Sequence, residues 1–160
     1  MSGGRQSRSV ARLAAVQALY QADQTGIGVE PVIGEFVKHR FGEEVDGAQF
    51  VAADPQLFAD IVRGASHRRT EVDGLLSSAL DPKFPLERLE MLLRAILRAG
   101  AYEVFAHTDT HPRILISEYV DVAHAFFAGR EPGMVNGVLD TVARKVRPEE
   151  LAQPAPGRED

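Results

Sequence analysis

Three arginines stand at the start of the chain with helical spacing. Arg5, Arg8 and Arg12 are three and four residues apart, and no acidic residue precedes Asp23. On a helix that turns by about 100° per residue, the three side chains project within a sector of roughly 60°. Guanidinium groups fit phosphate oxygens, and the free N–H groups at a helix start favour anions. The spacing therefore predicts a phosphate site at the start of the first helix.

The position of these arginines suggests a binding role but does not decide it. Cations near a helix N-terminus oppose the helix dipole, so helix stability alone would not select them. Tyr20, two turns after Arg12, offers a ring on which an unpaired base can stack, which contributes about 1–3 kcal/mol per base. The alternatives are that the arginines only solubilise a chain end and that Tyr20 is a core residue. Charge and spacing leave both interpretations open.

Other polar groups allow weaker interpretations. His107, Asp109 and His111 alternate, and imidazole with carboxylate can bind zinc, but polar residues are expected in a loop between helices. We expect no metal and no cofactor. The basic residues His67, Arg68 and Arg69 either extend an RNA-binding surface or form a solvated helix face. Arg94 and Arg98, one turn apart, either contact a partner or pair with carboxylates such as Glu90.

Composition limits the class of protein. The chain has 160 residues, 18 basic and 23 acidic side chains, a net charge of −5 and no cysteine. This length fits one domain, and the lack of cysteine excludes disulfides and thiolate metal sites. No apolar run is long enough to span a membrane, and residues 1–12 lack the apolar core of a secretory signal. We expect a cytoplasmic protein, and no motif of an enzyme stands out.

Apolar residues recur at three- and four-residue steps almost everywhere, which predicts an all-α fold. A glycine at position 100 should let a neighbouring helix approach closely. Residues 43–53 are expected to be a loop. The domain organisation expected is a flexible N-terminus (1–6), one helical domain (7–147) and a disordered tail (148–160). The helices expected cover residues 7–25, 31–41, 55–80 as one helix or two, 86–105, 113–128 and 133–146.

Four strings, in order, resemble the NusB family. They are ARLAAVQALYQ (11–21), RAILRAGAYEV (94–104), ISEYVDVAHAFF (116–127) and MVNGVLD (134–140). The order and spacing both match, so the resemblance covers roughly residues 7–147. It implies a compact bundle of about six to seven helices in two small subdomains.

The resemblance also implies a function. NusB-type factors pair with NusE, a small-subunit ribosomal protein, and bind the boxA element of nascent ribosomal RNA as part of the RNA polymerase antitermination complex. Carried over by position, the RNA-binding residues are Arg8, Arg12, Gln17 and Tyr20, with Arg5 upstream. Whether the protein forms a homodimer stays open.

Two alternatives remain at this point. NusB-like domains also form the N-terminal RNA-binding part of ribosomal RNA cytosine methyltransferases, so the chain is alternatively a stand-alone relative of that domain. The other alternative is a structural helical adaptor that does not bind RNA. The effect of arginine removal on RNA binding separates this adaptor from the antitermination factor.

Overall fold

The computed structural model describes residues 2–41 and 53–156, and every regular element in these ranges is a helix. The all-α prediction is therefore confirmed. The elements are α1 (Ser2–Thr25), α2 (Val29–His39), α3 (Pro55–His67), α4 (Arg69–Ala79), a 3-10 turn η1 (Leu86–Arg88), α5 (Met91–Ala106), α6 (Pro112–Phe126), α7 (Glu131–Val146) and α8 (Pro148–Leu151). The expected loop at 43–53 falls almost entirely outside the described residues.

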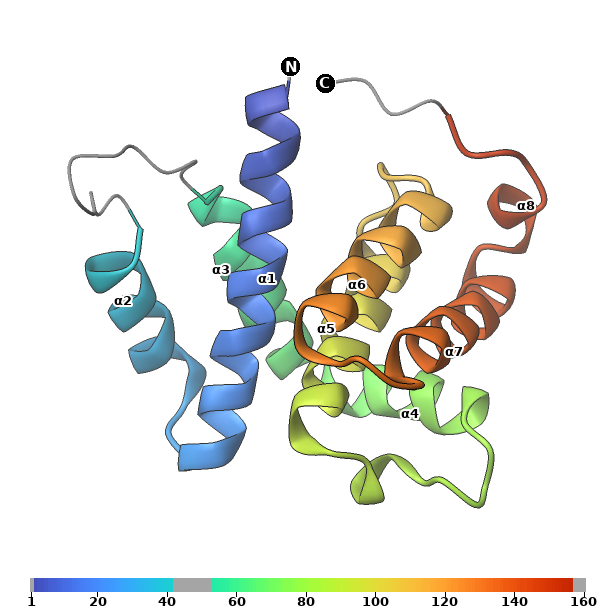
Figure 1. Cartoon of the computed structure of the whole chain (residues 1–160), viewed down its shortest axis with the longest axis horizontal. Coiled ribbons are helices and arrows are strands. Elements are labelled where there is room, and N and C mark those ends of the chain that lie inside the picture. The colour runs from blue at the N-terminus through green and yellow to red at the C-terminus, as the bar shows by residue number, and fades with distance from the viewer. Residues whose placement is uncertain (1, 42–52, 157–160) are drawn as a thin grey trace.

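Helix α1 occupies the middle of the molecule. In Figure 1 it stands between α2 on the left and the group α5, α6 and α7 on the right. A helix packed on several sides needs apolar side chains nearly all round, and between Ala11 and Ala22 most residues of α1 are buried. The helix begins at Ser2 rather than near Ser7, so residues 2–6 are helical where we expected a flexible end.

The apolar stripe from Leu57 to Leu80 forms two helices. The break falls at Arg68, whose φ of −101° and ψ of 22° leave the helical range. The helix α3 is capped by Asp54, whose carboxylate accepts hydrogen bonds from the N–H groups of Gln56 (3.1 Å) and Leu57 (3.0 Å). Such a cap satisfies N–H groups that have no partner within the helix.

Two glycines allow helices to approach closely. A Cβ built on Gly100 of α5 would lie 2.7 Å from Leu139 Cδ1 of α7 and 3.2 Å from Tyr119 Cγ of α6. The prediction for Gly100 is therefore confirmed. A Cβ on Gly64 of α3 would lie 2.0 Å from Tyr102 Cζ of α5. These positions bring α3, α6 and α7 against α5 at short range.

The two ends of the C-terminal half differ from the expected limits. Pro148–Leu151 forms a helical turn, and Leu151 is 2% exposed, so the expected tail begins with an ordered and buried segment. The helix expected from residue 86 is divided into η1 and α5, because Leu89 takes an extended conformation with ψ of 152°.

The buried apolar side chains of both groups of helices form one core. One group is α1 to α3 and the other is α4 to α7, and the core cluster contains residues from both. Helices α1 and α5 make the main contact between the groups. Within the described residues, no helix is both long and apolar enough to span a bilayer.

Candidate nucleic-acid interface

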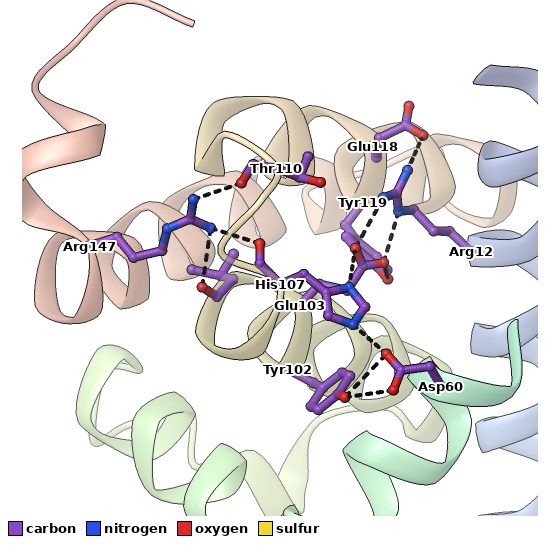
Figure 2. A network of polar contacts seen from close by, with 10 residues as sticks. Arg12, Asp60, Tyr102, Glu103, His107, Thr110, Glu118, Tyr119 and Arg147 are labelled. Atoms are coloured by element: carbon purple, nitrogen blue, oxygen red, sulfur yellow. Dashed lines mark hydrogen bonds and ion pairs between the residues drawn. The ribbon is translucent and has the colours of Figure 1, made fainter. Parts of the chain in front are cut away.

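Arg12 points into the protein rather than toward solvent. It is 4% exposed, and its guanidinium meets two carboxylates from other helices (Figure 2). Nε and Nη2 donate to the two carboxylate oxygens of Glu103 on α5 at 2.8 and 3.1 Å. Nη1 donates to Glu118 Oε1 on α6 at 3.0 Å. The guanidinium therefore joins α1, α5 and α6.

Further polar groups complete this buried site. The hydroxyl of Tyr119 donates to Glu103 Oε1 at 2.8 Å, and Ser9 Oγ donates to Glu118 Oε1 at 2.7 Å. His107 Nδ1 lies 3.3 Å from Glu103 Oε2, and its Nε2 contacts a carboxylate oxygen of Asp60 on α3. We call these residues the Arg12 cluster: Ser9, Arg12, Asp60, Glu103, His107, Glu118 and Tyr119.

The pair Arg12 and Glu103 is held in its charged state, and Tyr119 is held neutral. Burial opposes the charge on Arg12, but the hydrogen bonds and the charge of Glu103 outweigh it, so the pKa of the guanidinium is raised. Burial likewise opposes ionisation of Glu103, but hydrogen bonds from His107 and Arg12 outweigh it and lower its pKa. Burial and the neighbouring Glu103 raise the pKa of the Tyr119 hydroxyl. A buried carboxylate with several donors is the arrangement that compensates desolvation.

The other predicted RNA-binding residues lie outside this cluster. Arg8 is exposed and Arg5 is half-buried. Gln17 and Tyr20 are half-buried, and Tyr20 packs against the core. At about 100° per residue, Tyr20 points roughly 80° away from Arg12. The structure therefore places the arginines on one side of α1 and the two later residues on another.

Three other arginines singled out in the sequence, Arg68, Arg69 and Arg98, pair with carboxylates, whereas the buried Nε of Arg94 has no hydrogen-bond partner among the described residues. Arg98 is 7% exposed and binds Asp73 through Nε and Nη2, at 2.8 and 3.1 Å, and Asp23 through Nη1 at 3.0 Å. Arg69 Nη1 lies 3.3 Å from Asp23, and Arg68 pairs with Glu71. Carboxylate pairing, one of the two interpretations left open for Arg98, is thus observed, with partners other than Glu90.

The histidines of the loop before α6 have separate roles. His107 belongs to the Arg12 cluster, whereas His111 Nδ1 accepts the N–H of Arg113 and caps α6 at 3.1 Å. The described residues contain no group of three acidic or histidine side chains placed to hold a metal ion. Arg147 Nη2 donates to the carbonyl of Thr110 at 2.7 Å, which fixes the loop that carries both histidines.

Sequence reasoning missed the partners of Arg12. Glu103 stands within the apolar run of α5, and its neighbours Tyr102 and Val104 are both buried. An acidic residue in such a run requires a buried cation or donor, because an unpaired buried charge is costly. This signal marks Glu103 as a partner for some arginine, but it does not identify which one.

The fold and this site define an all-helical protein that presents arginines at the exposed start of a central helix. A family model described as the NusB family matches residues 9–144. The chain belongs to the NusB family.

Relatives cover nearly the whole chain. The transcription antitermination protein NusB of Caulobacter vibrioides is 49% identical over 148 residues, which are 92% of this chain and 99% of that protein. That of Bradyrhizobium sp. (strain BTAi1) is 49% identical over 144 residues, with 90% and 85% covered.

Solved structures share the fold. T. maritima NusB matches with a TM-score of 0.72 and 25% identity, covering 91% of this chain and 97% of that one. A crystal structure of antitermination factors NusB and NusE in complex with dsRNA matches with a TM-score of 0.73 and 22% identity, covering 88% and 98%.

Proposed function

We propose that this protein is a transcription antitermination factor that binds single-stranded boxA RNA of nascent ribosomal RNA together with NusE. It acts as a cytoplasmic binding protein within the RNA polymerase antitermination complex and does not catalyse a reaction. The observation that carries the RNA part is the arginine end of α1, where Arg8 is exposed in the second turn and the first turn carries no acid. This combination suits phosphate oxygens.

The proposed RNA-binding residues have different tasks. Arg5 and Arg8 contact phosphates at the end of α1. Gln17 and Tyr20 contact bases along another side of the same helix, where half-exposed amide and ring groups are available for hydrogen bonding and stacking. Arg12, which is nearly inaccessible, contributes from within the protein. An RNA strand that contacts both of these sides of α1 has to cross the helix obliquely.

The family relationship supports a pairing with NusE. Relatives that cover nearly the whole chain are antitermination proteins, and a protein of the same fold was crystallised with NusE and dsRNA. We expect weak binding of boxA RNA by this protein alone and tighter binding when NusE is present, because two partners then share the RNA.

A titration of labelled boxA RNA, with and without NusE and at two salt concentrations, tests the proposal. Each phosphate contact to single-stranded RNA contributes about 0.7 to the slope of log K against log salt. The double variant Arg5→Ala/Arg8→Ala should therefore bind more weakly and lower this slope by about one unit. The matched control is Arg144→Ala, which removes an exposed arginine of α7 that pairs with Asp140; its slope should not change.

The alternatives predict other results. Equal affinity for boxA and scrambled RNA, in the presence of NusE, would contradict the antitermination function and favour a structural adaptor. Tighter binding of double-stranded than of single-stranded boxA RNA would contradict the proposed single-stranded target. A slope that the double variant leaves unchanged would remove Arg5 and Arg8 from the site.

A further inference from the structure

We propose that Arg12 is a positioning residue for RNA binding, which acts by fixing the direction in which the arginine end of α1 projects. This inference rests on the function proposed above. Arg12 binds Glu103 with two hydrogen bonds and Glu118 with a third. Arg8 lies one helical turn before Arg12, so the orientation of Arg8 follows from the rotation of α1 at Arg12.

The position of the cluster within α1 supports this role. Before Ala11 the described side chains are exposed or half-buried, and burial begins at Ala11. The first turns therefore extend from the core with few apolar contacts. Two polar contacts help to hold them: the hydrogen bond from Ser9 to Glu118 at 2.7 Å, and one from the Asp54 N–H to the Ser7 carbonyl at 3.1 Å. The Arg12 cluster is thus the anchor next to the arginine end.

The bidentate contact of the Arg12 guanidinium with Glu103 is well suited to fix the rotation of α1 about its axis. Small side chains such as Ala11 and Ala15, both 0% exposed, permit close approach of neighbouring helices but define rotation weakly. Two parallel N–H···O bonds to one carboxylate add geometric specificity that a point charge lacks. Because the third bond goes to a different helix, α1 cannot rotate about its axis without breaking at least one of the three.

Direct contact between Arg12 and RNA is inconsistent with this geometry. The guanidinium donates to carboxylates through all three of its nitrogens. Its withdrawal toward a phosphate would leave Glu103, which is 0% exposed, without its main cation. Leaving a buried carboxylate unpaired is strongly unfavourable. The residue therefore influences RNA through the protein.

The decisive variant is Glu103→Gln. This buried residue cannot touch RNA, and its replacement removes one negative charge, so long-range electrostatics alone predicts tighter RNA binding. Positioning predicts the opposite: affinity for boxA RNA in the presence of NusE should fall by about tenfold, which corresponds to about 1.4 kcal/mol. Equal or tighter binding by folded Glu103→Gln would overturn the inference.

A double-mutant cycle tests whether the effect passes through the arginine end. In the Arg5→Ala/Arg8→Ala background, Glu103→Gln should weaken RNA binding little further, because the groups that it positions are gone. Additive effects would show that the cluster acts independently of Arg5 and Arg8, which contradicts the proposal. Helical circular dichroism and the melting temperature show whether each variant is folded under the binding conditions.

Two further variants keep the test interpretable. Arg12→Lys retains the charge but loses the bidentate contact, so it should also weaken binding, and it serves if Glu103→Gln does not fold. Asp73→Asn is the matched control, since it removes a carboxylate that binds buried Arg98 far from the first turns of α1; RNA affinity should stay within twofold of wild type, about 0.4 kcal/mol. If wild type does not prefer boxA over scrambled RNA, the proposed function and this inference both fail; the other outcomes bear on the inference alone.

Discussion

His107 lies between carboxylates from two different helices. Its Nδ1 faces Glu103 on α5, and its Nε2 faces Asp60 on α3 (Figure 2). Both ring nitrogens meet acceptors, so both donate when the ring is protonated. Burial works against the charge, but Glu103 and Asp60 outweigh it and raise the pKa of His107 above its ordinary value of 6.5. The imidazolium therefore links α3 to α5.

The raised pKa of His107 predicts a pH-dependent stability. The charged ring stabilises the fold fully below pH about 6.5, the pKa in the unfolded chain, and this stabilisation is lost as pH rises through the higher pKa of the folded state. Between pH 6 and pH 9 the free energy of unfolding of wild type should therefore fall relative to that of His107→Gln. Tyr102, whose pKa burial and Asp60 raise to about 12, stays neutral throughout.

Urea unfolding at several pH values measures this difference. His124→Gln is the control, because it removes an exposed histidine of α6 that lies outside the Arg12 cluster. Parallel curves for wild type and His107→Gln would show that His107 is not the titrating group.

At the scale of single residues, the sequence predicted the spacing of the arginines on α1 but not the side chains that surround Arg12. The three- and four-residue steps correctly place the arginines on one side of a helix. Which side of that helix is buried depends on Glu103 and Glu118, which are 91 and 106 residues away from Arg12. No local pattern contains such a pairing, and so Arg12 was predicted as a surface ligand.

At the scale of elements, periodicity located the helices better than their ends. The apolar repeat of α1 begins at Val10, so the sequence gives no signal that the helix extends back to Ser2. The break between α3 and α4 occurs at Arg68 although no glycine or proline stands there. The guanidinium of Arg68 binds Glu71 and lies 4.7 Å from the centre of the Phe105 ring on α5. Such tertiary contacts do not appear in a local pattern.

Gly64 and Gly74 form a matched pair within neighbouring helices. Alanine at an exposed helical glycine usually stabilises by about 1 kcal/mol. Nothing lies within 4 Å of a Cβ on Gly74, so Gly74→Ala should raise the melting temperature. Gly64→Ala should instead destabilise by about 1–3 kcal/mol, because the Tyr102 ring in its way is 6% exposed and bonded to Asp60.

Thermal melts of the two variants check this contrast. The same substitution, in the same type of element, is expected to have opposite signs at positions ten residues apart. Stabilisation by Gly64→Ala would mean that α3 and α5 can separate to admit a methyl group.

At the scale of the whole molecule, the two groups of helices share one apolar core and the Arg12 cluster. Neither group buries its apolar face without the other. We therefore expect a single cooperative unfolding transition, with equal calorimetric and van't Hoff enthalpies. Scanning calorimetry at neutral pH measures both quantities. A calorimetric enthalpy well above the van't Hoff value, or two separate peaks, would show that the groups unfold independently.

Arg147 donates hydrogen bonds to several carbonyl oxygens at the end of α5 and in the following loop. It is 6% exposed and donates to the carbonyls of Val104, His107, Thr108 and Thr110, and its Nε binds Glu150 at 3.0 Å. The stretch matched by the family model ends earlier, at residue 144. A polypeptide that ends at residue 144 would lose the hydrogen bonds from Arg147 to these carbonyls, and it would also lose the buried side chain of Leu151.

The smallest autonomous unit should accordingly run through residue 152. A chain ending at residue 146 should melt at a lower temperature than one ending at 152, and a protease should cleave it faster between residues 107 and 111. Equal melting temperatures would show that Arg147 and Leu151 do not contribute to the stability of the fold. A recombinant protein that ends where the family similarity ends would therefore lack Arg147, which binds the carbonyl of His107 and helps to hold this residue in place.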